Sequence, residues 1–153
     1  MPNNIVPNGD FECGLLDWTL QVPDSSARTS ISVESHTWSY AFEVDLLQPA
    51  KTTELGVSAR IISKPVPVED GTGYELRFWT YFDGPDNGFI GVTINGGFGY
   101  AVDARDKGWG AWHENIVNYK ADSSTAIIKF EFLFGMAVKG IDRLDTITLV
   151  KSS

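Results

Sequence analysis

The strongest constraint on this chain is the alternation of apolar and polar residues within short segments. In the segment 74–82, one phase holds the residues that we expect in a core: Tyr74, Leu76, Phe78 and Phe82. The other phase holds Arg77, Trp79 and Tyr81. Successive side chains of a β-strand point to opposite faces of the sheet. The segment therefore predicts a strand with one buried face and one outer face.

The same alternation recurs along the chain, and clusters of Gly, Pro, Asn and Asp interrupt it about every ten residues, the spacing of an all-β sandwich. In 126–134 the expected core set is Ile128, Phe130, Phe132 and Phe134. Asn95-Gly96-Gly97 is typical of a tight hairpin. Residues 1–153 form a single domain in this interpretation, with strands expected at 4–7, 10–12, 18–22, 29–35, 39–47, 56–67, 73–82, 88–95, 98–104, 111–119, 125–134 and 144–151.

Charge limits the partners of the chain. The net charge is −8, and no cluster of Lys and Arg offsets it. A nucleic-acid backbone or an anionic membrane surface would be repelled, so we expect neither as a partner. Cys13 is the one cysteine and cannot form an intrachain disulfide. Neutral ligands such as sugars remain open.

The outer phases of three segments suggest a ligand-binding face. If these strands are neighbours, that face gathers Trp79, Tyr81, Arg77, Glu43 and Glu131. Aromatic rings stack on the C–H faces of sugar rings, and charged planar groups bond the hydroxyls. We expect Trp79 and Tyr81 to form the stacking platform. The alternative is a solvated sheet face with two isolated aromatic residues.

Two further tryptophans lie in expected loops. Trp38 and Trp109 have Gly, Ser or Thr neighbours, and we expect them to line the rim of the binding cleft. Trp18 and Trp112, by contrast, are expected in the core or at a sheet edge.

The stretch Asn4–Glu12 follows the pattern N-(L/I)-(I/V)-x-N-G-x-F-E, and Trp18 comes soon after it. This opening resembles that of carbohydrate-binding modules of families 4, 9 and 22, which share a galactose-binding-like fold. The other matching segments, in the family's order, are Tyr40–Val44, Val66–Trp79, Gly108–Trp112 and Asp145–Leu149. Thr146 stands where the family has a second Asp.

The resemblance implies a jelly-roll β-sandwich of two antiparallel sheets, with a ligand cleft on the concave sheet. It implies non-catalytic binding of a soluble polysaccharide chain, of β-glucan or xylan type, by a secreted, monomeric module of a larger glycoside hydrolase. It also implies a structural calcium ion (Ca2+), with Glu12 and Asp145 at the family's ligand positions and Asp10 nearby. Backbone oxygens of 34–39 would complete the calcium site, although His36 and Trp38 depart from the family's small residues there.

Two other classes of function stay open. A jelly-roll glycoside hydrolase needs two carboxylates at a defined separation, and Glu43 and Asp45 with Glu131 could supply them. The E-x-D motif of laminarinase-like enzymes, however, continues to a second Glu, where this chain has Gln48. A structural or protein-binding sandwich would explain the fold and the acidity, but not the shared Trp79, Tyr81 and Arg77 face.

Overall fold

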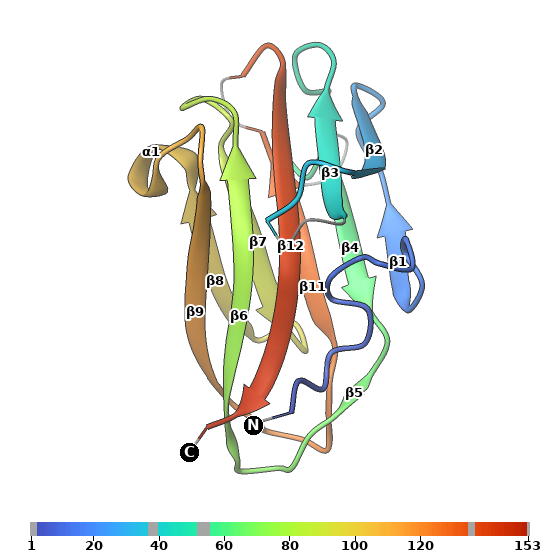
Figure 1. Ribbon diagram of the computed structural model, residues 1–153, viewed down its shortest axis with the longest axis vertical. Coiled ribbons are helices and arrows are strands. Elements are labelled where there is room, and N and C mark those ends of the chain that lie inside the picture. The colour runs from blue at the N-terminus through green and yellow to red at the C-terminus, as the bar shows by residue number, and fades with distance from the viewer. Residues whose placement is uncertain (1–2, 37–39, 52–55, 135–136, 153) are drawn as a thin grey trace.

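Two five-stranded antiparallel sheets pack face to face in the computed structural model, which describes residues 3–36, 40–51, 56–134 and 137–152 (Figure 1). Sheet A has the strand order β1-β4-β11-β7-β8, and sheet B the order β2-β3-β12-β6-β9. A short pair, β5 and β10, connects them at one end. This architecture confirms the predicted all-β jelly-roll sandwich.

The strands have the following bounds. Sheet A contains β1 (Trp18–Gln21), β4 (Ala59–Ser63), β11 (Ile128–Leu133), β7 (Phe89–Ile94) and β8 (Phe98–Asp103). Sheet B contains β2 (Ala27–Ser32), β3 (Ala41–Leu46), β12 (Gly140–Lys151), β6 (Gly73–Phe82) and β9 (Trp112–Lys120). The short pair is β5 (Val66–Pro67) and β10 (Thr125–Ala126).

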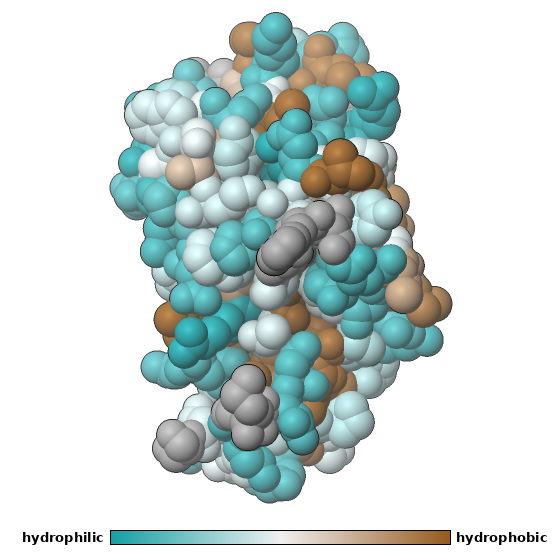
Figure 2. All heavy atoms as spheres, in the orientation of Figure 1, coloured by the Kyte–Doolittle hydropathy of each residue, from teal (hydrophilic) through white to brown (hydrophobic). Residues whose placement is uncertain are grey.

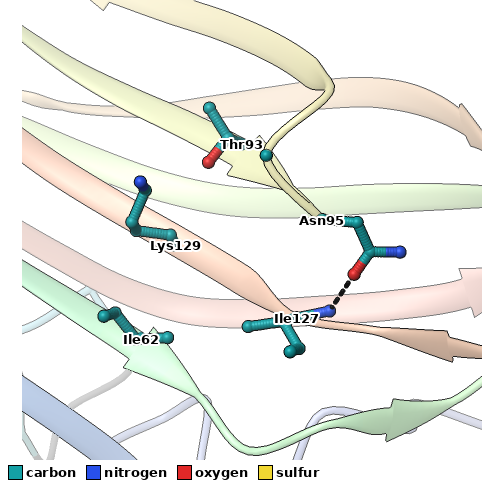
Figure 3. Close-up of a pocket in the computed structure, with 6 residues that line it drawn as sticks. Ile62, Thr93, Asn95, Ile127 and Lys129 are labelled. Atoms are coloured by element: carbon teal, nitrogen blue, oxygen red, sulfur yellow. Dashed lines mark hydrogen bonds between the residues drawn. The ribbon is translucent and has the colours of Figure 1, made fainter.

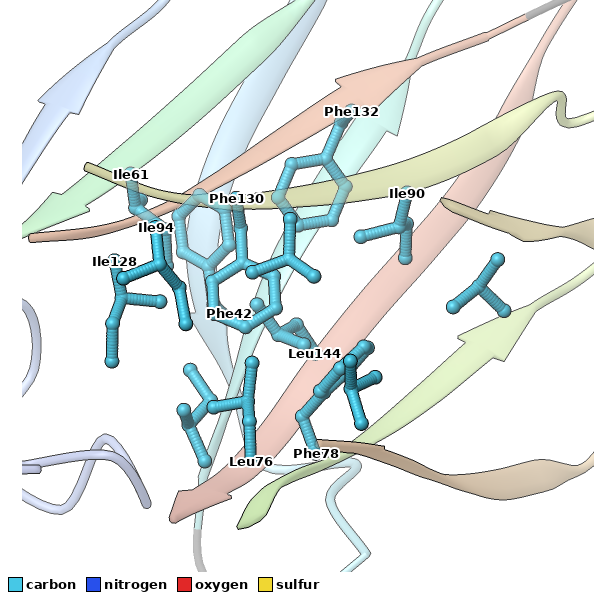
Figure 4. Packing of buried hydrophobic residues seen from close by; sticks show 14 of the residues in the cluster. Phe42, Ile61, Leu76, Phe78, Ile90, Ile94, Ile128, Phe130, Phe132 and Leu144 are labelled. Atoms are coloured by element: carbon cyan, nitrogen blue, oxygen red, sulfur yellow. The ribbon is translucent and has the colours of Figure 1, made fainter. Parts of the chain in front are cut away.

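Phenylalanine side chains from both sheets fill the space between them (Figure 4). The rings of Phe78 and Phe130 lie 5.1 Å apart, and those of Phe42 and Phe132 lie 5.4 Å apart. Every member of the two core sets expected from the sequence is buried, from Tyr74 to Phe82 on β6 and from Ile128 to Phe134 along β11. The alternation therefore predicted the inner face of both strands correctly.

Some expected strands are absent or shorter. The segments 4–7 and 10–12 are not strands, and Asn8 and Phe11 have φ angles of 50° and 56°, which a strand excludes. The expected strand 56–67 divides into β4 and β5. A one-turn helix, α1 (Ala104–Lys107), was not expected; the side chain of Asp103 caps it. No helix in the described ranges has the length and apolarity needed to span a membrane.

The opening motif holds the N-terminal segment against sheet B. The side-chain amide of Asn8 forms hydrogen bonds with the backbone of Cys13, Gly14 and Leu16. The backbone carbonyl oxygen of Asn8 accepts the indole N–H of Trp18. Gly9 lies against β12, where its carbonyl oxygen accepts the N–H of Ile147 at 2.9 Å. These contacts give the N-G-x-F pattern a structural role.

We predict that Gly9→Ala destabilises the fold. A Cβ atom at this position would lie 2.1 Å from the carbonyl oxygen of Ile147, so the backbone must move apart. The free energy of unfolding should fall by about 1–3 kcal/mol, the usual cost of overpacking, measured by urea denaturation. Gly97→Ala is the control, because a Cβ atom there meets nothing within 4 Å. Equal stability of the two variants would contradict this role for Gly9.

A buried carboxyl group closes one end of the core. Asp142 is fully buried, and one of its oxygens accepts the amide N–H of Asn87 at 2.9 Å. Its other oxygen has no hydrogen-bond partner among the described residues. Burial raises the pKa of Asp142 well above its ordinary value, and nearby Asp83 raises it further. Folding therefore shifts Asp142 towards its neutral form.

We predict that Asp142→Asn stabilises the protein at neutral pH. Because the folded state favours the protonated acid, the contribution of Asp142 is fully present below the ordinary aspartate pKa of about 3.9 and is lost as the pH rises through the folded-state pKa. The variant should thus melt at a higher temperature than the wild type at pH 7, and the gap should narrow towards pH 4. A gap independent of pH in thermal melts would refute the assignment.

Candidate functional site

Sheet B brings together most of the residues predicted to bind a ligand. Arg77, Trp79 and Tyr81 alternate along the outer face of β6, and Glu43 lies on the same face of β3. Strand β12 lies between them and contributes Arg143, which is paired with both Tyr81 and Glu43. Figure 2 shows this side of the molecule as mostly hydrophilic.

The rings on this face already have partners within the protein. The imidazole of His36 stacks on Trp79, with ring centroids 3.6 Å apart and 13° between the planes. Trp112, on the edge strand β9, lies 5.7 Å from Tyr81, and the Arg143 guanidinium lies 4.9 Å from the centre of the Tyr81 ring. A sugar that stacked on the covered face of Trp79 would have to displace His36.

The charged groups of the sheet B face also pair with one another. Arg77 contacts Glu75 at 2.5 Å and Glu114 at 3.7 Å. Arg143 contacts Glu43 at 2.8 Å and reaches Glu34 at 3.2 Å. The rings and ion pairs of this face thus contact one another, while the buried Nδ1 of His36 has no hydrogen-bond partner among the described residues. The use of the face as a stacking platform stays a prediction.

Glu131 does not lie on this face. It belongs to β11 in sheet A, so its side chain lies on the outer face of sheet A, on the other side of the sandwich from Glu43. The prediction that it joins Glu43 and Asp45 is wrong, because alternation gives the outward phase of a strand but not the sheet to which the strand belongs. Trp38 lies outside the described residues. Trp109 is 51% exposed in the turn between α1 and β9, at one end of the sandwich.

The outer face of sheet A carries a different constellation. Arg60 on β4 donates from Nε to Glu131 at 3.1 Å and from a terminal nitrogen to Gln21 at 2.9 Å. Only 8% of Arg60 is exposed, so the guanidinium is held rigidly across β1, β4 and β11. Arg60 was not among the residues predicted from the sequence, where the signal is a cation inside an otherwise small and apolar run, Val57–Ile62.

Residues with a small side chain, or with none, form a strip next to this cluster. Gly91 on β7 pairs with Glu131 on one side and Ala101 on the other. A Cβ atom added to Gly91 would meet only the carbonyl oxygen of Tyr100, at 4.0 Å. Phe89 and Leu133 lie at one end of this strip, and Ile62 lies near its other end. The outer face of sheet A thus has a polar cluster next to a strip of small residues, and apolar side chains lie at both ends of this strip.

The expected calcium ligands are not gathered around one point. Asp145 is fully buried, and its two oxygens accept the backbone N–H groups of His36 (3.0 Å) and Thr146 (2.7 Å). Glu12 and Asp10 are exposed in the N-terminal turns. Within the described ranges, no three His, Cys, Asp or Glu side chains form a group that could hold a metal. Asp145 is the one expected ligand with a buried carboxylate, and part of the expected carbonyl loop lies outside the described residues.

Comparison with known proteins gives matches of structure alone. No protein-family model matches the chain, and no curated protein does. The structure is similar to that of TmCBM61 in complex with β-1,4-galactotriose, with a TM-score of 0.68, 18% identity and coverage of 98% of this chain and 99% of that chain. It is also similar to a family 16 carbohydrate-binding module, with a TM-score of 0.65, 19% identity and coverage of 96% and 99%.

A third similar structure includes an enzyme. The CBM22-1 and GH10 modules of the Clostridium thermocellum endo-1,4-β-D-xylanase 10B, complexed with xylohexaose, match with a TM-score of 0.61 and 12% identity. The match covers 99% of this chain and 29% of that chain. At such identities these likenesses establish a shared fold.

We propose that a calcium ion binds beside Asp145. A ligand that binds the native state alone stabilises it by mass action, so removing calcium with a chelator should lower the melting temperature. Asp145→Asn should melt at the same temperature with and without chelator, because a weaker ligand replaces the carboxylate. Glu12→Gln tests the second expected ligand in the same way. A wild type whose melting temperature ignores both chelator and added calcium would exclude the site.

Proposed function

We propose that this chain binds a polysaccharide, without cleaving it, across the outer face of sheet A. The observation that carries the proposal is the Arg60 cluster: a nearly buried guanidinium fixed by Gln21 and Glu131 on the outer face of sheet A. Groups held in place before binding lose little entropy on contact with a ligand. Sugar hydroxyls both donate and accept hydrogen bonds, and the cluster presents amide, guanidinium and carboxylate groups to them.

The shape of the face supports an extended ligand. The strip over Gly91 and Ala101 lacks long side chains, so a chain of sugar rings can lie close to the sheet. Phe89 is 37% exposed at one end of the strip and offers an apolar ring to the C–H face of a sugar. Contacts of this kind on an open face give micromolar to millimolar affinities, because each hydroxyl also gives up bonds to water.

The similar structures support the same class of ligand. Two of them are complexes with oligosaccharides, β-1,4-galactotriose in one and xylohexaose in the other. We therefore include β-1,4-galactan beside the β-glucans and xylans expected from the sequence. A role as a targeting module of a secreted glycoside hydrolase is part of this proposal.

The arrangement of carboxylates disfavours hydrolysis by Glu43 together with Glu131, two of the three carboxylates considered from the sequence. A glycoside hydrolase places two carboxylates about 5–9.5 Å apart around one bond. Glu43 and Glu131 point outward from opposite sheets, and the cores of stacked sheets are about 10 Å thick. These two groups therefore cannot flank the same glycosidic bond.

We predict that Gly91→Leu weakens polysaccharide binding by about tenfold or more, because the new side chain occupies the space above the strip. A tenfold loss of affinity corresponds to about 1.4 kcal/mol. A Cβ atom fits at this position, so the fold should keep its melting temperature. Affinity electrophoresis and titration calorimetry with soluble β-glucan, xylan and β-1,4-galactan measure the effect.

Trp79→Ala is the matched variant on the opposite face. Binding that survives Trp79→Ala and fails in Gly91→Leu assigns the ligand to sheet A. The reverse result would move the site to the platform predicted on sheet B. Release of reducing ends would indicate an enzyme. Failure to retard the protein in any glycan, with the fold intact, would favour the structural or protein-binding alternative.

A further inference from the structure

A separate pocket opens at one end of the sheet A face (Figure 3). Its volume is about 330 Å³, and it is lined by Ile62, Thr93, Asn95, Gly96, Ile127 and Lys129. Ile62 and Lys129 lie two residues from Arg60 and Glu131 on the same outward phases of β4 and β11. The pocket is therefore continuous with the polar cluster, and its size is at the lower end for a ligand site, suited to one sugar unit.

Lys129 alone carries a charge among the described residues that line the pocket. Its ammonium nitrogen lies 3.9 Å from one oxygen of Glu131, while the other oxygen of Glu131 accepts the Arg60 N–H at 3.1 Å. Lys129 thus shares the carboxylate of Glu131 with Arg60, in a chain of net charge −8. About a third of the Lys129 side chain, 34%, is exposed.

The remaining wall of the pocket is neutral and fixed. The Asn95 amide accepts the Ile127 N–H at 2.8 Å and donates to the Thr125 carbonyl at 2.9 Å, so it ties the β7–β8 hairpin to β10 and β11. Asn95 and Gly96 have φ angles of 54° and 72°, as this tight turn requires. Ile62 and Ile127 supply apolar surface to the same pocket.

One polar atom beside the pocket has no partner. The Thr93 hydroxyl oxygen is buried and makes no hydrogen bond within the described part of the chain. Thr93 is the cross-strand neighbour of Lys129, and Figure 3 shows the two side chains on the same side of their strands. A buried hydroxyl without a partner is costly, and a change of its rotamer would direct it to a ligand acceptor next to the ammonium group.

We propose that this pocket binds the carboxylate of a uronic acid unit, an acidic sugar within or attached to an otherwise neutral polysaccharide. The proposal rests on the function proposed above and specifies its ligand. A carboxylate has two acceptor oxygens, which suit the Lys129 ammonium and the Thr93 hydroxyl, while Ile62 and Ile127 face the C–H surface of the ring. A densely charged polyuronate fits less well, because the net charge of −8 repels it.

The test compares methyl β-D-glucuronide and methyl β-D-galacturonide with the uncharged methyl β-D-glucoside and galactoside, which carry CH2OH in place of the carboxylate. Titrations of the isotope-labelled protein are followed by backbone amide NMR shifts, read at Thr93, Gly96 and Lys129. One uronide of the two should bind about two- to fivefold more tightly than its neutral partner, the strength of a partly exposed ion pair, and the preference should shrink as salt is added.

Lys129→Met should remove the preference for the uronide. Lys64→Met makes the same change of net charge just beyond β4, where Lys64 pairs with Asp17 at 2.8 Å instead of lining the pocket, and should keep the preference. Equal affinity for charged and neutral sugars, or a preference that survives Lys129→Met, would overturn the inference. Because β-glucan and β-1,4-galactan are neutral chains, their binding to sheet A would stand even then.

Discussion

The packing of phenylalanine rings between the two sheets is the interaction on which the rest of the structure depends. Phe42, Phe78, Phe130 and Phe132 come from strands of both sheets and are completely buried. A ring fixed in the core fixes the phase of its strand, since a shift by one residue would turn the whole inner set outward. The outward positions of Trp79 and Glu131 follow from that phase.

The two outer faces produced in this way differ in how their groups are satisfied. On sheet B, His36 covers Trp79 and Arg143 joins Tyr81 to Glu43, so the aromatic and charged groups stabilise one another. On sheet A, the polar groups around Arg60 form one rigid cluster. Next to this cluster lies Gly91, where no side chain covers the backbone. Polar groups on both faces thus have partners within the protein, and the faces differ in that glycine leaves backbone uncovered on sheet A.

The residues of the opening motif, which carries the family resemblance, have mainly structural roles in this chain. Asn8 organises the first turns, Gly9 allows close approach to Ile147, and Phe11 is buried against Trp18 and Phe42. These roles depend on the sandwich and not on the ligand. The residues proposed to contact sugar, such as Arg60 and Lys129, lie outside the motif.

The sequence by itself determined the strand class, the inward phase of β6 and β11, and the hairpin at Asn95-Gly96, because alternation and turn conformation are local properties. It did not determine which strands are neighbours. Glu43 and Glu131 have the same outward phase, yet β3 and β11 lie in different sheets. Only the tertiary structure decided this, and with it the stacking of His36 on Trp79 and the Arg60 cluster, because strand order depends on contacts between segments far apart in the chain.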